Sequence, residues 1–102
     1  MIHVIATITT HPGRRADLLT EFTKILEPVR AEDGCIEYGT AVDAKTDIAA
    51  QIPFRPDVVT VVEKWESLDH LKAHLDAPHM HTFRGRVKNI VTETSLSILE
   101  SA

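Results

Sequence analysis

Apolar residues recur along the chain with two different periods, and these periods predict which segments are strands and which are helices. In residues 2–10 the apolar side chains occupy every second position, at Ile2, Val4, Ala6 and Ile8. This alternation is typical of a strand that buries one of its faces. The sequence therefore predicts that the chain begins with a strand.

A helix is predicted to follow, after a break at residues 11–13. Pro28 would crowd the carbonyl group of Lys24, so we expect the last turn to be kinked or broken, with the helix ending between Glu27 and Asp33. Gly34 then suits a left-handed C-terminal cap. The apolar positions recur at steps of one, three and four, as on one face of an α-helix: Leu18, Leu19, Phe22, Ile25, Leu26 and Val29.

Two further strands are predicted on either side of a long irregular segment. Alternation resumes over residues 36–42, which include Tyr38, and residues 58–66 are rich in β-branched side chains on both faces. Residues 43–57 hold prolines and charged residues around a short apolar patch of Ile48, Ile52 and Phe54. We interpret this excursion as a lid over a cavity or, by preference, as an arm that grips a partner subunit.

The second half of the chain repeats the order of helix and strand. Ser67 is a good N-cap for a short helix that ends near Asp76, Pro78 fits the first turn of another helix, and residues 94–100 alternate as a fourth strand. The order strand, helix, strand, strand, helix, strand is that of the α+β ferredoxin-like fold, a split βαβ with a four-stranded antiparallel sheet. Helices cover one sheet face, and we expect the other to pack against a second copy in a homodimer.

Composition limits the partners that can be expected. The 102 residues make one domain, residues 1–102, with a formal charge of −4, which argues against nucleic acid as a partner. No apolar run approaches the roughly 20 residues that cross a bilayer, so no membrane partner is expected. The one cysteine, Cys35, is interpreted as a core residue. Without a signal-like segment at the amino terminus, we expect a cytoplasmic protein.

Three polar or aromatic residues in the second half are predicted to converge. Glu63 and Trp65 are two positions apart on a strand and so project to the same side, while the next helix brings His74 back over the sheet. A carboxylate, an indole and an imidazole would then share one region. The alternative is purely structural, with Trp65 in the core and His74 hydrogen-bonded beneath a helix.

The same stretch carries a recurrent motif. It runs through Val62-Glu63-Lys64-Trp65-Glu66-Ser67, Leu71, Ala73-His74-Leu75, Pro78-His79 and Phe83, with Gly34-Cys35-Ile36-Glu37-Tyr38 in the first half. This pattern resembles the antibiotic biosynthesis monooxygenase family over nearly the whole chain, apart from the excursion at residues 43–57. The resemblance implies a dimeric α+β barrel with one pocket per subunit. It also implies an oxygenase that acts on quinols, anthrones or polycyclic phenols with molecular oxygen and without metal, flavin or other cofactor.

Such chemistry needs an apolar cavity and a group that accepts the phenolic proton, because the substrate itself supplies the electrons. We expect His74 to accept or orient that proton, and Glu63 to fix the tautomer of His74 or to bind a hydroxyl group. Trp65 is expected to act with these two residues. The other residues expected to shape the substrate pocket are Tyr38, Phe83, His79 and Leu71.

Haem degradation on the same fold is one alternative. Haem-degrading relatives use an Asn on the first strand, a Trp on the third and a His on the second helical segment. Trp65 and His74 stand in suitable places, but Ala6 and Thr7 occupy the region where the Asn is expected. A small-molecule binding protein or an isomerase that uses the same pocket without oxygen is the other alternative.

Four histidines between positions 70 and 81 raise the question of a metal site. His70 and His74 are four apart, which places them on one helical face, and His79 and His81 follow Pro78. The glutamate of the zinc-protease motif is absent between the first two, and no cysteine pair assists. We therefore expect no metal, with His70 and His81 exposed to solvent.

Overall fold

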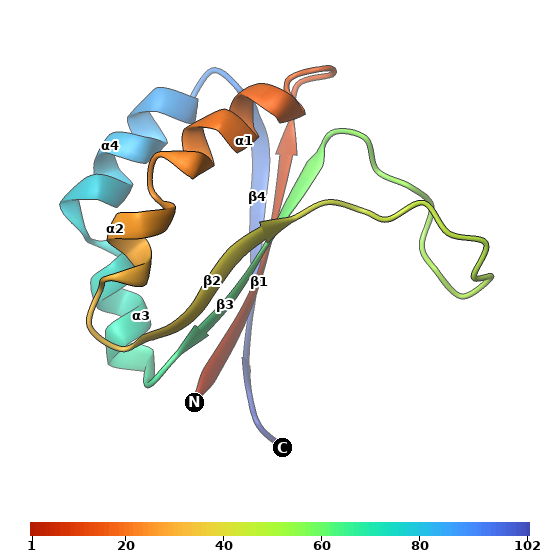
Figure 1. The fold of residues 1–102 in the computed structure, drawn as a ribbon. Coiled ribbons are helices and arrows are strands. Elements are labelled where there is room, and N and C mark those ends of the chain that lie inside the picture. The colour runs from red at the N-terminus through yellow and green to blue at the C-terminus, as the bar shows by residue number, and fades with distance from the viewer.

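The computed structural model describes residues 1–102 as one antiparallel sheet with four helices on one of its faces (Figure 1). The elements follow the predicted order, except that the first helix is divided in two. None of the helices is long and apolar enough to cross a membrane. Along the chain the elements are β1 (Ile2–Thr10), α1 (Arg15–Thr23), α2 (Leu26–Arg30), β2 (Cys35–Ala41), β3 (Val58–Trp65), α3 (Leu68–Leu75), α4 (Pro78–Val87) and β4 (Val91–Glu100).

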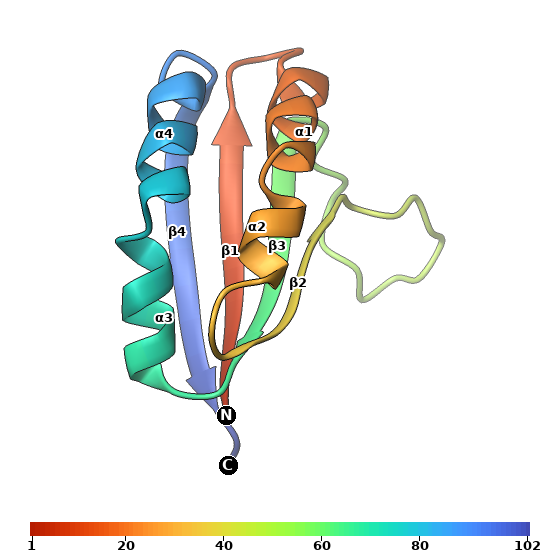
Figure 2. The same cartoon turned by 60° about the vertical axis from the view of Figure 1, so that its left-hand side comes forward.

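The strands lie in the order β2-β3-β1-β4, and every neighbouring pair is antiparallel. The central pair, β1 and β3, aligns Val4 with Glu63 and Ala6 with Val61. Both terminal strands of the chain are therefore adjacent in the sheet, and β2 and β4 form its edges. This arrangement confirms the α+β ferredoxin-like fold. The turned view in Figure 2 shows α3 and α4 lying over the β4 side of the sheet, with α1 and α2 beside them.

Proline divides the predicted first helix. α1 ends at Thr23, and the five-residue α2 starts at Leu26, so that Pro28 falls in the first turn of the new helix. In this position the missing N–H of proline costs no helical hydrogen bond. The break falls beside Lys24, whose carbonyl group a continuous helix would have pressed against the proline ring. The prediction of a broken last turn is confirmed.

Two connections that shape the site follow from single residues. Ser67 caps α3 by accepting a hydrogen bond from the backbone N–H of His70, at 3.2 Å. Gly34 adopts a φ of +78°, which directs the chain from α2 into β2, and its carbonyl accepts a hydrogen bond from the N–H of Glu66. The side chain of His70 packs directly against Gly34, so that a Cβ atom at position 34 would lie 2.3 Å from the imidazole ring. His70 is consequently half-buried, not exposed as expected, whereas His81 is exposed.

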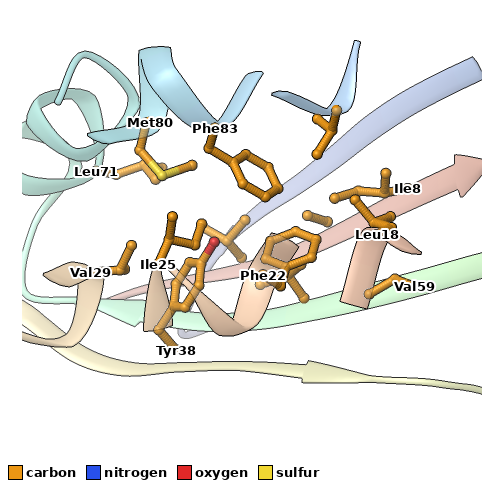
Figure 3. Close-up of a cluster of buried hydrophobic side chains, with 14 of the residues drawn as sticks. Ile8, Leu18, Phe22, Ile25, Val29, Tyr38, Val59, Leu71, Met80 and Phe83 are labelled. Atoms are coloured by element: carbon orange, nitrogen blue, oxygen red, sulfur yellow. The ribbon is translucent and has the colours of Figure 1, made fainter. Parts of the chain in front are cut away.

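The core fills the space between the helices and the helix-facing side of the sheet. From β1 and β3 it takes alternate residues, in agreement with the predicted faces of these strands. Figure 3 shows Phe22 of α1 and Phe83 of α4 facing each other, with ring centroids 4.6 Å apart. Cys35 is half-buried against this core, as expected, and burial raises the pKa of its thiol.

The opposite side of the sheet carries no helix. It displays alternate residues of the central strands, among them Ile5 and Val62, which are only half-buried. Residues 43–57 form no helix or strand and project away from the helices, toward this open side (Figure 1). Asp43 and Arg55 close the base of this excursion with two side-chain hydrogen bonds of 2.8 and 2.9 Å.

Candidate functional site

A cavity of about 410 Å³ lies between the helices and the sheet. Its walls are mainly apolar, and they include Phe22 and Phe83. Its polar groups are few: Tyr38 on β2, Glu63 on β3, His74 on α3, Thr94 on β4, and Arg84 and Lys88 at the end of α4. A mostly apolar hollow of this size with a small set of polar groups is typical of a small-molecule site.

His74 is held at this cavity by a carboxylate from another element. The α3 helix turns the imidazole toward the sheet, where only 2% of the residue is exposed. Its Nδ1 lies 2.8 Å from Oε2 of Glu32, in the turn between α2 and β2. With Glu32 ionised, Nδ1 carries the proton and donates a hydrogen bond to the carboxylate. Nε2 then keeps its lone pair and lies toward Glu63, 3.9 Å from its Oε1.

Glu63 is positioned by the indole that follows it on the same face of β3. Nε1 of Trp65 donates a hydrogen bond of 2.9 Å to Oε1 of Glu63, and both residues are buried. The Trp65 ring also packs on His74, with ring centroids 4.6 Å apart. The predicted convergence of carboxylate, indole and imidazole is therefore observed, with Trp65 beneath the other two and outside the cavity lining.

Burial shifts the pKa values of these groups in the directions that favour their neutral forms. It raises the pKa of Glu63 to about 7, against the opposing hydrogen bond from Trp65 and with support from the negative charge of Glu32. Burial likewise lowers the pKa of His74, and the hydrogen bond to Glu32 offsets this only in part. Burial also raises the pKa of Tyr38, so its hydroxyl stays protonated and able to donate a hydrogen bond. Near neutral pH the cavity thus holds the neutral imidazole of His74 beside the carboxyl group of Glu63, which loses its proton in this pH range.

The other predicted pocket residues are divided between the cavity and its surroundings. Tyr38 and Phe83 line the cavity, and Figure 3 shows the Tyr38 side chain pointing away from β2, with its hydroxyl group toward the layer that holds Phe22 and Phe83. Leu71 packs in the core and His79 lies at the surface, 30% of its side chain being exposed, and neither lines the cavity. Nε2 of His79 instead lies 2.8 Å from Oε2 of Glu32.

Glu32 is the residue that the sequence pattern did not reveal. One of its oxygens is shared by two imidazoles, His74 and His79, which come from different helices. Tautomer fixing, one of two roles expected of Glu63, therefore lies with Glu32 in the geometry of the site. Glu32 lies in the turn between α2 and Gly34, and no local pattern marks it, because its contact with α3 is a long-range one. The C-cap of α2 is Ala31, so Gly34 has the expected left-handed conformation but does not itself cap the helix.

The same three side chains have the composition of a transition-metal site. The ligand atoms of Glu32, His74 and His79 lie within 4.8 Å of one another. This set differs from the histidine pairs considered from the sequence, because His70 forms a hydrogen bond with Ser67 and His81 forms one with Asp76. The two hydrogen bonds to Glu32 explain the close approach of the three groups without an ion.

The region where haem-degrading relatives are expected to hold an Asn contains no amide side chain. Ala6 lines the cavity, whereas the half-buried Thr7 belongs to the other face of β1. The polar groups present suit proton transfer instead. Nε2 of His74 and Oε1 of Glu63 are two acceptors 3.9 Å apart. Tyr38, a hydroxyl donor, lines the same mostly apolar cavity, and its ring centroid lies 5.5 Å from that of His74. Together these groups can take a proton from a hydroxylated aromatic and stabilise the resulting anion.

Known proteins are similar to this chain in sequence or in fold. Residues 1–86 match the antibiotic biosynthesis monooxygenase family. The probable quinol monooxygenase YgiN of Escherichia coli K12 is 40% identical over 102 residues, which cover 98% of this chain and 97% of that protein. Among solved structures, PA3566 from Pseudomonas aeruginosa has a TM-score of 0.81 at 24% identity, covering 99% of this chain and 93% of the other. Rv0793 from Mycobacterium tuberculosis has a TM-score of 0.80 at 24% identity, covering 99% and 94%. The two structures share the fold, and the family match together with the 40% identity shows that this chain belongs to the antibiotic biosynthesis monooxygenase family.

Proposed function

We propose that this protein is a cofactor-independent monooxygenase that oxidises an electron-rich aromatic, such as a quinol or an anthrone, with molecular oxygen. The observation that carries this proposal is the buried His74, whose Nδ1 is held by Glu32 and whose Nε2 is left as a proton acceptor beside Glu63. Family membership and the 40% identity to a probable quinol monooxygenase support the same reaction class.

The reaction begins with proton transfer. Nε2 of His74 accepts the proton of the substrate hydroxyl, and the resulting imidazolium is stabilised by the Glu32 carboxylate at its Nδ1. The phenolate or enolate so formed gives one electron to molecular oxygen, and the two radicals combine to form a carbon–oxygen bond. Breaking of the C–H bond at that carbon and of the O–O bond then releases water and leaves a carbonyl group. The substrate supplies all the electrons, so the balance requires no other reductant.

The polar groups of the cavity divide the remaining tasks. Tyr38 donates a hydrogen bond to the substrate oxygen as it gains negative charge, since its own proton is held firmly. Glu63, with a pKa raised to about 7 by burial, binds a second hydroxyl group of the substrate. Phe22 and Phe83, whose rings pack on each other, form an apolar wall against which the aromatic system of the substrate lies, and they exclude water from it.

Oxygen consumption tests the proposal directly. An oxygen electrode with a panel of quinols, naphthols and anthrones is expected to show catalysed uptake with at least one of them. His74→Ala should lower kcat about 10²- to 10⁴-fold, the usual contribution of a positioned base. His81→Ala, a change at an exposed histidine on the next helix, should leave it unchanged.

The remaining outcomes distinguish the alternatives. Thermal stabilisation by a quinol without oxygen uptake would replace the oxygenase with a binding protein. A sharp Soret shift on mixing with hemin, followed by loss of absorbance when a reductant is added, would favour haem degradation. Undiminished uptake by His74→Ala would remove the assigned base.

The proposed enzyme is a homodimer formed through the open face of the sheet, as the family resemblance implies. Half-buried Ile5 and Val62 leave apolar surface on this face, and the excursion at residues 43–57 projects on the same side (Figure 1). Ile5→Lys, which places a charge in the middle of the face, is expected to yield monomers in sedimentation equilibrium. A cytoplasmic location is part of the same proposal.

A further inference from the structure

The cavity opens at the edge of the sheet formed by β4. Leu96 lies on the helix-facing side of this strand, opposite Ala6, and lines the cavity. It is nevertheless 42% exposed, whereas Ala6 is buried. The space over β4 is therefore not closed by the helices, and a ligand can enter between this strand and the end of α4.

Two cations stand at this opening. Arg84 and Lys88 are four residues apart at the end of α4, and both line the cavity and are exposed. One guanidinium nitrogen of Arg84 donates to the carbonyl of Leu75, which fixes the side chain and leaves its other N–H groups free. A ligand that enters the cavity must therefore pass next to two positive charges.

The sign of these charges is opposite to that of the whole protein. The chain carries a formal charge of −4, yet both charged residues at the cavity mouth are basic. The single acidic residue of the lining, Glu63, lies deeper and is buried. A mouth lined with cations in an otherwise acidic protein concentrates anions at the entrance of an apolar hollow.

We propose that the substrate is an aromatic acid: a hydroxylated fused-ring compound that enters with its hydroxyl group toward His74 and leaves a carboxylate between Arg84 and Lys88. The identity of the reactive hydroxyl rests on the proposed function, whereas the recognition of the carboxylate does not. Arg84 binds the carboxylate through paired N–H donors, and Lys88 adds a mobile positive charge. The fused rings lie against the packed pair of Phe22 and Phe83, which forms part of the apolar wall of the cavity.

Binding of a matched pair of ligands tests this assignment without catalysis. 6-Hydroxy-2-naphthoate and its methyl ester share the ring and the hydroxyl group and differ by one negative charge. Calorimetric titration under argon is expected to show the acid binding about five- to tenfold more tightly than the ester at low salt. An apolar cavity without cations would give the reverse order, because the ester is the more apolar compound.

Two variants and a change of salt concentration locate the source of the preference. Arg84→Gln combined with Lys88→Gln should abolish the preference for the acid while leaving the affinity for the ester within about twofold. Arg86→Gln removes the same kind of charge from the same helix at an exposed residue that does not line the cavity, and should keep the preference. Added 0.5 M NaCl should weaken binding of the acid and leave the ester unaffected.

Each result either supports the assignment or overturns it. Equal or tighter binding of the ester to the unaltered protein, or an equal loss of preference in Arg86→Gln, would overturn it. Preferred binding of the acid without oxygen uptake from any quinol would sustain the carboxylate site and refute the oxygenase. Catalysed uptake from neutral quinols, with no preference for acids in binding, would refute the carboxylate site and sustain the oxygenase.

Discussion

Glu32 and His74 are 42 residues apart in the sequence, and Oε2 of the glutamate lies 2.8 Å from Nδ1 of the histidine. The contact joins the turn after α2 to the last turn of α3. It leaves only Nε2 of His74 free to meet a ligand in the cavity. The proposed base is therefore oriented by a residue that does not itself line the cavity.

Replacing Glu32 with Gln is expected to lower kcat by about tenfold or more, because the imidazolium formed during proton transfer loses its anionic partner. Glu32 raises the pKa of His74 through its hydrogen bond and its charge, so Glu32→Gln should lower this pKa further. NMR titration of the imidazole would measure the change, and the acid limb of the rate profile should move to lower pH with it. Asp33→Asn changes the adjacent, almost fully exposed carboxylate and should alter neither quantity.

Glu63 should make the protein less stable as the pH rises. Burial raises its pKa from 4.5 to about 7, so the folded state holds a proton that the unfolded chain releases. The stability that protonated Glu63 gives the folded state is fully present below pH 4.5. It is lost progressively as the pH rises to about 7, a difference of roughly 3 kcal/mol in the free energy of unfolding. Glu63→Gln keeps the acceptor for Trp65 and should remove this pH dependence in urea unfolding.

A fluorescence titration provides a second measurement of the same group. Trp65 is the only tryptophan and its Nε1 donates to Glu63, so its emission should change with a midpoint near pH 7. Glu63→Gln should abolish that transition, while Glu66→Gln, a change at an exposed residue, should preserve it. A transition that persists in Glu63→Gln would assign the titration to another group.

The sequence predicted what depends on local pattern and missed what depends on long-range contact. Strand alternation identified the buried face of β3, with Glu63 and Trp65 on it, and Pro28 predicted the broken helix. The start of β4 was misplaced by three residues, since Val91 pairs with Thr10 across a register shift that no local pattern encodes. Glu32 escaped detection for the same reason, because its partners are 42 and 47 residues away.

Gly34 is required where it stands, and Gly85 is not. Gly34→Ala should cost at least about 1–2 kcal/mol in the free energy of unfolding, because φ is +78° and the new Cβ would meet the ring of His70. Gly85→Ala lies in the exposed part of α4 with no atom within 4 Å of the added Cβ, and should stabilise by roughly 0.5–1 kcal/mol. Thermal and urea unfolding measure both changes.

A double variant separates the two causes at position 34. If the close approach contributes, Gly34→Ala should cost less in a His70→Ala background than in the unaltered protein. If the backbone conformation alone matters, the cost should be the same in both backgrounds. A neutral effect of Gly34→Ala would contradict both explanations.

The excursion at residues 43–57 gives the dimer its sharpest test. None of its residues lines the cavity, and it projects away from the helices, which favours the arm over the lid (Figure 1). Ile48 and Ile52 are 65% and 56% exposed, so Ile48→Ser combined with Ile52→Ser should scarcely affect the fold of one subunit. If a partner covers them, each loses roughly 1–2 kcal/mol of apolar contact, and the dissociation constant of the dimer should rise about tenfold or more. Sedimentation equilibrium measures that constant.

A control variant tests the helical side of the subunit. Leu68→Ser removes an exposed side chain from α3 and should leave dimerisation unchanged. An unaltered dissociation constant in the double variant would show that these side chains do not bind a partner.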